Sequence, residues 1–284
     1  MARMGHEVII VGRDREKGMR AADELRSTTD NGKISFLAAD LSLVSDVRQL
    51  AEQVLGLCSE LHYLVHSAGI VRGRRTLTAE GIESNFATNY LSRFALTLQL
   101  LSLLDAAGTP EIAARVLLVG GAARTGRIYF DDVNLSKNFN TLRAVGQFCQ
   151  ANDVFAVELT RRLAATHQKP RITITCLKIG VVKTNIRREF PTWMKWLVPL
   201  VFDPLLSQTP EQAADSALRL LLSQKFEGIS GALFLKIRKF RRIKRDLQLD
   251  REQGRRLWRL SQELSYQASQ PAVAVGAHVS TART

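Results

Sequence analysis

The sequence has few cysteines, no long apolar run and fewer acidic than basic residues. Its 284 residues include three cysteines, Cys58, Cys149 and Cys176, which lie far apart and form no Cys-x-x-Cys pair. A disulfide framework or a structural zinc site is therefore not expected, and a reducing compartment is. No stretch of about 18 apolar residues could span a membrane. The N-terminus also lacks the apolar centre of a signal peptide. These absences favour a cytoplasmic protein without a metal site.

The charge is strongly one-sided. Lys and Arg number 40 against 27 Asp and Glu, which gives a formal net charge of +13 at pH 7. Such a balance suggests an anionic partner: a phosphate-bearing cofactor, an acidic lipid surface or nucleic acid. With 45% hydrophobic and 24% charged residues, the composition is that of a folded chain and excludes a disordered one.

Short β-branched runs alternate with segments of helical periodicity. Alternation of this kind predicts a parallel sheet covered on both faces, the doubly wound α/β class. One domain over residues 1–265 and a disordered tail over 266–284 are expected. Strands are predicted at 6–12, 33–39, 61–65, 115–119, 171–177 and 231–236, and helices at 15–27, 42–57, 81–104, 142–166 and 210–223.

Several stretches in this order resemble the short-chain dehydrogenase/reductase family, in particular its retinol-dehydrogenase-like and protochlorophyllide-reductase-like branch. The resemblance implies a Rossmann-like fold and an NADP(H)-dependent oxidoreductase of a lipophilic alcohol, aldehyde or ketone. It also implies a homo-oligomer, or pairing with an active relative, since the family is often dimeric or tetrameric. The matching stretches are Val8–Asp14, Ala39–Leu41, His66–Gly69, Asn85–Leu91, Ile128–Asn134 and Ile179–Thr184.

The family's opening strand and Thr-Gly-x-x-x-Gly-x-Gly turn have no counterpart here. In the family, the backbone amides of this turn and the helix behind it hold the cofactor pyrophosphate. Residues 1–5 resemble the end of that helix. Two explanations stay open: the gene start was placed too far downstream, or the chain is truly shortened. In either case, NADP(H) is the expected cofactor if there is any, and weak binding is predicted.

The family's catalytic residues are also replaced. Gly121 occupies the position of the Ser, Val145 that of the Tyr and Cys149 that of the Lys. Only Asn89, the family's proton-relay Asn, remains. Hydride transfer to a carbonyl needs a proton donor, which the Tyr supplies with its pKa lowered by the Lys. Because losing a general acid alone costs ~10²–10⁴-fold in rate, ordinary carbonyl reduction is not expected.

Five further positions match residues that contact the family's cofactor. Arg13 is placed to meet the adenosine 2′-phosphate, and Asp40 either contacts adenine or caps a helix. Ala68 and Gly69 let the backbone pass close to the cofactor or make a tight turn. Thr184 either touches the nicotinamide amide or caps a helix.

Three other side chains invite a catalytic interpretation. Tyr90 and Tyr129 lie beside matched motifs, where either could supply a displaced hydroxyl, although the resemblance assigns them no role. His66 replaces an Asn of the family turn and is expected to pack locally. Buried, inert thiols are the commoner case for cysteines such as Cys149 and Cys176.

Two surface segments suggest partners. Residues 190–206 are apolar with two Trp, which suits a lipophilic substrate, an interfacial membrane contact or a lid packed on its own domain. Residues 236–245 contain seven basic residues, so this segment is either a solvated loop or a contact to an anionic membrane surface. Nucleic acid is an unfavoured partner, because no nucleic-acid motif accompanies the patch.

Two functional hypotheses follow. In the first, an enzyme of this lineage performs altered chemistry, such as a non-redox isomerisation or cyclisation, or a redox step with a displaced acid. In the second, the protein is a non-catalytic binding protein or a scaffold for an active relative.

Overall fold

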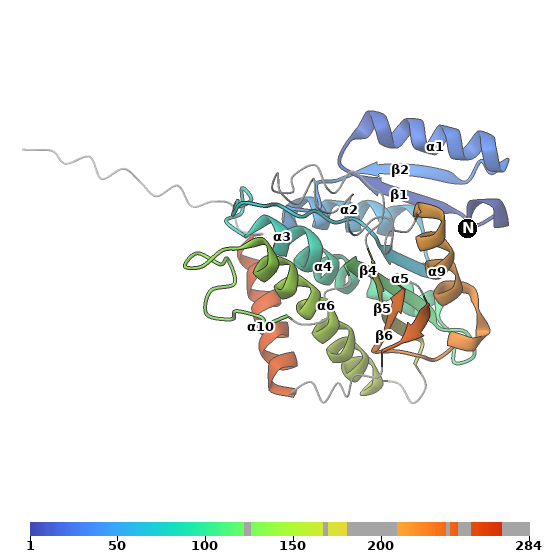
Figure 1. Cartoon of the computed structure of the whole chain (residues 1–284). Coiled ribbons are helices and arrows are strands. Elements are labelled where there is room, and N and C mark those ends of the chain that lie inside the picture. Colours follow the sequence, from blue (N-terminus) through green and yellow to red (C-terminus); the bar gives the residue numbers. More distant parts are fainter. Residues whose placement is uncertain (122–125, 167–169, 181–208, 237–238, 244–250, 269–284) are drawn as a thin grey trace, which may run out of the picture.

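Strands and helices alternate along the chain (Figure 1). The computed structural model describes residues 1–121, 126–166, 170–180, 209–236, 239–243 and 251–268. The strands are β1 (Val8–Gly12), β2 (Ile34–Ala38), β3 (Tyr63–His66), β4 (Ala114–Gly121), β5 (Ile172–Ile179), β6 (Ala232–Lys236) and β7 (Phe240–Arg242). The longer helices are α1 (Arg15–Thr29), α2 (Val44–Leu57), α4 (Ser92–Gln99), α5 (Leu101–Ala107), α6 (Thr141–Ala164), α9 (Pro210–Leu222) and α10 (Arg251–Gln267). Single turns are η1 (Ala2–Met4), α3 (Ser84–Phe86), η2 (Ala87–Leu91) and η5 (Gln224–Phe226).

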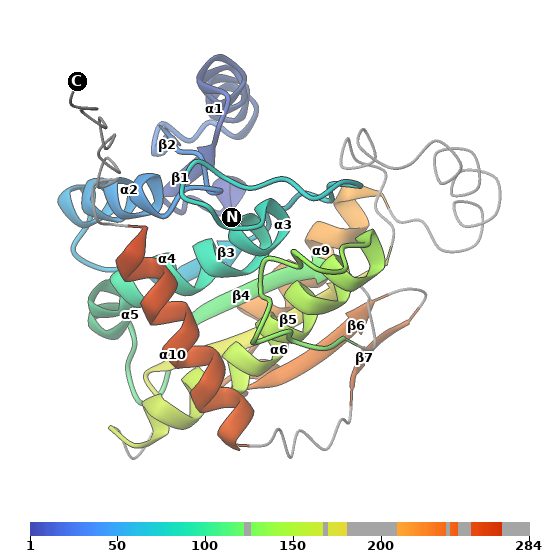
Figure 2. The same ribbon diagram turned by 90° about the vertical axis from the view of Figure 1, so that its left-hand side faces the viewer.

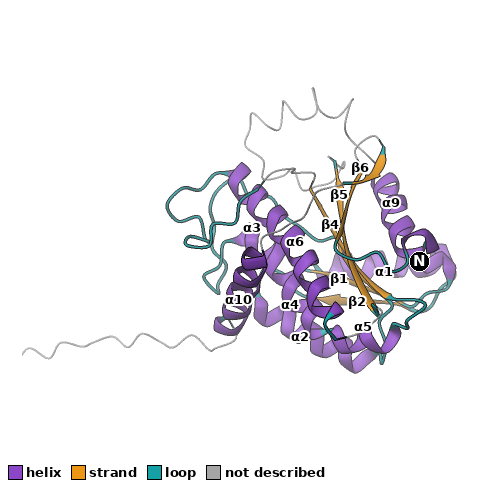
Figure 3. Ribbon diagram, turned by 90° about the horizontal axis from the view of Figure 1, so that it is seen from below, coloured by secondary structure: helices purple, strands orange, loops and turns teal. Residues whose placement is uncertain are grey.

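The strands form two sheets. β1 pairs with β2 in parallel, with Val8 opposite Ile34. The second sheet has the order β3-β4-β5-β6-β7, parallel up to β6 and closed by the antiparallel edge strand β7. Helices cover both faces (Figure 3), with α2, α4, α6 and α10 on one side and α1 and α9 on the other. The predicted doubly wound class is therefore confirmed.

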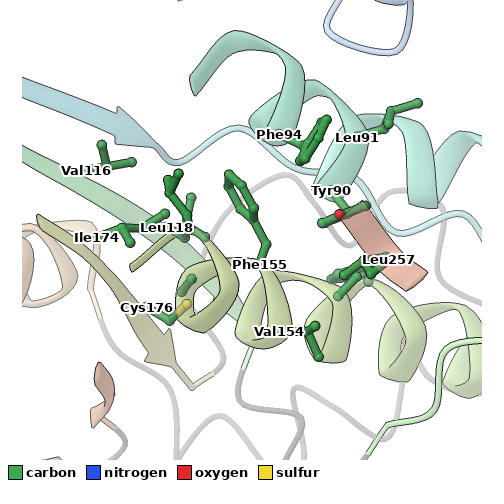
Figure 4. Close-up of a cluster of buried hydrophobic side chains, with 14 of the residues drawn as sticks. Tyr90, Leu91, Phe94, Val116, Leu118, Val154, Phe155, Ile174, Cys176 and Leu257 are labelled. Atoms are coloured by element: carbon green, nitrogen blue, oxygen red, sulfur yellow. The ribbon is translucent and has the colours of Figure 1, made fainter. Parts of the chain in front are cut away.

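The main core lies between the second sheet and helices α4, α6 and α10. It is built around aromatic rings: Phe94 lies 5.3 Å from Phe155 and 5.1 Å from Trp258 between ring centroids. Figure 4 shows Phe155 in this cluster, with Leu118 of β4 on one side and Tyr90 and Leu257 on the other. Aromatic pairs at such spacing add to the free energy of burial, so this core holds α10 firmly against α6.

The boundary between the two sheets falls between β1 and β3. Among the described residues, neither strand pairs with a neighbour on that side. They are nevertheless close, because the ring of His6, just before β1, packs edge-on against Tyr63 of β3 at 5.9 Å. Ile9 and Val11 of β1 also pack against the same core cluster as Leu61 and Leu64. The two sheets thus share a core without sharing a hydrogen-bonded strand.

Two predictions about elements were wrong, and one helix was not predicted. The helix expected over 81–104 is interrupted by the π-type turn η2 and by a break at Leu100 between α4 and α5. Within the basic segment 236–245, residues 240–242 form β7 rather than a loop, and Lys236 ends β6. The domain boundary at 265 falls inside α10 (Figure 2), which was not predicted because its charged residues outnumber its apolar ones. The rest of the expected tail, 269–284, lies outside the described residues.

Candidate active site

The ends of β3 and β4 bring several predicted site residues together. Ala68 and Gly69 follow β3, and Gly121 ends β4. A Cβ placed on Gly69 would stand only 2.6 Å from Oδ1 of Asn89, which is closer than side chains approach in folded proteins. Glycine is therefore required at position 69 for the chain to pass over the helix that carries Asn89.

Asn89 fastens this loop to the helix beneath it. Its Oδ1 accepts a hydrogen bond from the backbone N–H of Ile70 at 3.1 Å, and its Nδ2 donates to the carbonyl of Ile70 at 2.8 Å. Nδ2 also donates to the carbonyl of Asn85, while the carbonyl of Asn89 itself accepts from Nδ2 of Asn152. Asn89 lies in η2, and such π-type turns are frequent at functional sites. In this structure its amide has a positioning role.

The three replaced catalytic positions do meet in space. The Cys149 thiol, which is 5% exposed, donates to the carbonyl of Gly121 at 3.7 Å. A Cβ on Gly121 would lie 4.0 Å from Cys149 Sγ, an ordinary contact. Val145, one helical turn before Cys149, packs half-buried against the main core. The positions that the sequence matches to the family's Ser, Tyr and Lys thus hold a glycine, a valine and a thiol, and none of these groups is a proton donor suited to carbonyl reduction.

Neither tyrosine replaces the lost acid in a simple way. Tyr90 was considered as a displaced donor, but its side chain is fully buried and its hydroxyl hydrogen-bonds Oγ of Ser261 on α10 at 2.7 Å. Burial raises the pKa of Tyr90 far above its usual value. Tyr129 is half-buried and has the guanidinium groups of Arg127 and Arg143 over its ring, at 5.7 and 5.9 Å. Tyr90 is therefore a core residue. For Tyr129, the role of a displaced proton donor stays a prediction.

Arg13 and Asp40 lie together after β1 and β2. Arg13 Nη1 is 3.8 Å from Asp40 Oδ2, with side chains 67% and 31% exposed. Asp40 does not cap α2, which corrects one of its two interpretations. Instead, the carboxylate of Glu80 accepts from the N–H groups of Val44 and Ser45 at 2.6 and 2.9 Å. The cap comes from a residue 36 positions away, so the local sequence could not indicate it.

The other predicted positions lie elsewhere. Thr184 and the apolar segment 190–206 fall outside the described residues. Within the described ranges, no three His, Cys, Asp or Glu side chains gather as a metal site would require.

A dinucleotide would find only part of its usual site among the described residues. A pyrophosphate is commonly held by free N–H groups at a helix N-terminus. The helices that follow β1, β2, β3 and β4 are already capped there by side chains: Asp14 on α1, Glu80 on α2, Glu83 on α3 and Asn140 on α6. Three of these caps are carboxylates, which repel phosphate. The described residues therefore fit the adenosine end, through Arg13, but not the pyrophosphate of NADP(H).

Two buried cations beside this corner were missed by sequence reasoning. Lys178 on β5 forms an ion pair with Asp153 on α6 at 2.6 Å, with side chains 6% and 1% exposed. Arg93 on α4 is 4% exposed, and its Nη2 donates to the carbonyl of Ala68 at 2.9 Å. The only available signal was a charged residue inside an otherwise apolar helix and strand, a pattern that does not reveal a partner.

The buried charges affect the neighbouring titratable groups. Burial lowers the pKa of His66 to about 3, and the positive charge of Arg93 adds to the effect. His66 is therefore neutral at physiological pH, with Nε2 2.9 Å from Oγ1 of Thr97, as expected for local packing. Burial, with Asp153 nearby, raises the pKa of Cys176 well above its usual value. This thiol stays protonated, as expected for an inert cysteine.

Comparisons with known proteins bear on this geometry. A family model described as short chain dehydrogenase matches residues 1–120. Mouse retinol dehydrogenase 12 is 31% identical over 265 residues, which cover 93% of this chain and 80% of that protein. The chain belongs to the short-chain dehydrogenase/reductase family. Human polyprenol dehydrogenase is 30% identical over 232 residues, 81% of this chain and 69% of that protein. The predicted retinol-dehydrogenase-like branch is thus confirmed.

Several solved structures share the fold. An uncharacterised Mycobacterium paratuberculosis protein superposes with a TM-score of 0.71 at 26% identity, covering 93% of this chain and 86% of its own. Pseudomonas aeruginosa RhlG, solved with NADP, gives a TM-score of 0.63 at 23% identity over 82% of this chain and 86% of its own. The Rossmann-like architecture persists here although the parallel strands are divided into two sheets.

Proposed function

We propose that this member of the family binds a lipophilic alcohol, aldehyde or ketone and does not reduce it by the family's Tyr–Lys route. The ligand class is supported by the relatives, which are named for retinol and polyprenol. One observation carries the loss of reduction: the Cys149 thiol is hydrogen-bonded to the Gly121 carbonyl, which joins the positions matched to the family's Lys and Ser. A thiol with this partner brings no fixed positive charge and no hydroxyl to a substrate oxygen.

The residues around the expected cofactor site also bear on how tightly NADP(H) binds. The family implies NADP(H), and the exposed guanidinium of Arg13 suits a 2′-phosphate. The side-chain caps of α1, α2 and α3 are carboxylates, which repel a pyrophosphate at these helix N-termini. We therefore expect NADPH to bind this chain more weakly than micromolar, which fluorescence titration measures. Micromolar or tighter binding would refute this expectation.

A second candidate function is an isomerisation or cyclisation without change of oxidation state. The observation that favours it is Arg93, a buried cation beside the replaced positions. A cation can stabilise negative charge that develops on a substrate oxygen without any hydride donor. Conversion of retinal into isomers by the protein without cofactor, followed by chromatography, would favour this candidate over simple binding.

The main test is a reduction assay with purified protein. We expect saturable binding of retinal, seen as quenching of protein fluorescence, and no NADPH-dependent loss of retinal above background. A parallel assay with an active retinol dehydrogenase controls for substrate delivery. Robust reduction by this chain would refute the proposal and would make Tyr129 the first residue to mutate.

We also propose peripheral attachment to anionic membranes. No helix in the described part of the chain is long and apolar enough to cross a membrane. Arg241 and Arg242 are exposed on the edge strand β7, and each basic residue near an anionic surface contributes about 1 kcal/mol. Replacing both by Gln should weaken salt-sensitive binding to phosphatidylserine vesicles, whereas replacing the exposed Arg15 and Arg20 of α1 should not. Equal binding to neutral vesicles would contradict the proposal.

A further inference from the structure

Arg93 places a guanidinium between the ends of β3 and β4. Its Nη2 donates to the Ala68 carbonyl and lies 3.9 Å from where a Cβ on Gly69 would stand. Its Nη1 lies 3.9 Å from the corresponding point at Gly120. The side chain therefore rises from α4 through the core and ends beneath two positions that carry no side chain.

The guanidinium has little to satisfy it. Among the described residues, the Ala68 carbonyl is its one hydrogen-bond acceptor, and Nε is buried with no partner. A guanidinium has five N–H donors, so most of this group is uncommitted.

Among the described residues, the charge of Arg93 has no carboxylate paired with it either. The nearby buried carboxylate, Asp153, is paired with Lys178 at 2.6 Å. The other titratable groups around Arg93 are His66, Cys149 and Cys176. His66 is neutral, and Cys176 is protonated because burial raises the pKa of its thiol. Burial lowers the pKa of Arg93 only to about 10, so the cation persists at neutral pH. A buried cation without a counter-charge is strongly unfavourable and is retained where it has a use.

We propose that Arg93 is an anion-binding residue, whose guanidinium holds a carboxylate group of a lipophilic ligand beside Gly69 and Gly120. The inference rests on the proposed function for the lipophilic character of the ligand, and it adds the charged head group. The fork of N–H donors matches the two oxygens of a carboxylate. The absence of a side chain leaves an approach at Gly120, where Nη1 of Arg93 is the one described atom within 4 Å of where a Cβ would stand. At Gly69 that place is taken by Oδ1 of Asn89, at 2.6 Å.

The first test measures the thermal stability of the protein without ligand. Arg93→Met removes the charge at similar length, and Arg115→Met is the matched control, since Arg115 is equally buried but paired with Glu227. We expect the thermal midpoint of apo Arg93→Met to equal or exceed that of the wild type, and that of Arg115→Met to fall. If Arg93→Met lowers the midpoint as much as Arg115→Met does, Arg93 is a structural residue and the proposal is wrong.

The second test uses palmitate and hexadecanol, which share a chain length and differ in the head group. Their dissociation constants are measured by displacement of a fluorescent fatty-acyl probe at fixed ionic strength. The wild type should bind palmitate roughly tenfold or more tighter than hexadecanol, the ratio expected of a charge-assisted hydrogen bond. Arg93→Met should remove that ratio by weakening palmitate alone, and Arg93→Lys should fall between, because it keeps the charge but loses the fork.

The outcomes separate this inference from the proposed function. Equal affinity for both ligands, unchanged in Arg93→Met, refutes the role of Arg93 and leaves the lipophilic ligand standing. If neither long-chain ligand binds, the proposed function fails. In that case, thermal stabilisation by hexanoate is compared with stabilisation by hexanol, because these short chains need no long apolar site. This comparison decides whether Arg93 binds an anion. Stabilisation of the wild type by hexanoate alone, absent in Arg93→Met, would support anion binding, and no difference would overturn it.

Discussion

Burial sets the chemistry of the histidine that ends β3. His66 is 7% exposed and has Thr97 as a hydrogen-bond partner. Its pKa falls from 6.5 to about 3 on folding, because burial and the charge of Arg93 both disfavour the imidazolium. The unfolded chain therefore binds a proton near pH 6 that the folded chain does not bind. Stability from this residue is fully present above pH 6.5 and declines as the pH falls below it.

This linkage predicts a specific acid sensitivity. Between pH 6.5 and pH 5, the free energy of unfolding of the wild type should fall by about 2 kcal/mol because of His66. His66→Gln keeps a polar group near Thr97 that cannot gain a proton. Over the same pH range, the free energy of unfolding of this variant should therefore fall by about 2 kcal/mol less than that of the wild type. Urea titrations at both pH values measure the difference. The same pH slope in the two proteins would show that His66 is protonated in the folded state.

The site illustrates which residues sequence can and cannot predict. Gly69 and Asn89 lie in stretches that match the family, and the spacing of those stretches located Gly121 and Cys149. The structure places Gly69 against Asn89 and Gly121 against Cys149. Arg93 gives no such signal, because what makes it notable is that no carboxylate in the described part of the structure pairs with it. The cap that Glu80 places on α2 was missed for a similar reason, since its partners are distant in sequence.

At the scale of elements, periodicity predicted the strands and helices whose apolar faces are complete. The capping box of α9, where Thr209 and Gln212 bond each other's backbone, was visible as a Thr-Pro helix start. α10 was not visible, because it contributes mainly Leu257 and Trp258 to the core while most of its surface is charged. Tertiary contacts rather than local pattern hold it in place.

One buried hydrogen bond joins α10 to η2. Ser261 Oγ and the Tyr90 hydroxyl are 2.7 Å apart, and both side chains are fully buried. Ser261→Ala should cost about 1–3 kcal/mol of stability, because the buried hydroxyl of Tyr90 loses its partner. Adding Tyr90→Phe should recover part of that loss, since no unpaired group then remains.

A double-mutant cycle in urea measures this coupling. The control pair is Ser27→Ala with Tyr90→Phe, because Ser27 is exposed on α1 and bonds only its own helix. Additive effects for Ser261 and Tyr90 would show that the hydroxyls are hydrated and that α10 is held by its apolar contacts alone.

At the scale of the whole molecule, the parallel strands are divided into two sheets between β1 and β3. The division lies on the side of both strands that has no partner among the described residues. It is also where the sequence comparison expected the family's opening strand and glycine-rich turn. The expected weakness of pyrophosphate binding and the division of the sheet therefore concern the same side of β1 and β3, whereas the expected replacement of the catalytic hydroxyl and amine concerns β4 and α6.

These two changes can be tested independently in four proteins. The first is the unaltered chain, and the second carries Gly121→Ser, Val145→Tyr and Cys149→Lys. The third has an N-terminal extension with the strand and glycine-rich turn of a retinol dehydrogenase, and the fourth combines both. Positions 145 and 149 lie one helical turn apart, so the introduced hydroxyl and amine share a face of α6.

NADPH binding should appear with the extension, whether or not the catalytic residues are restored, because the turn supplies free N–H groups to the pyrophosphate. Retinal reduction should appear only in the combined protein, since a general acid alone is worth ~10²–10⁴-fold. Titration with NADPH and a retinal assay on all four proteins measure both effects. A combined protein that binds NADPH and retinal yet stays inactive would show that the site has diverged beyond these three positions, and Arg93 would be the next residue to replace.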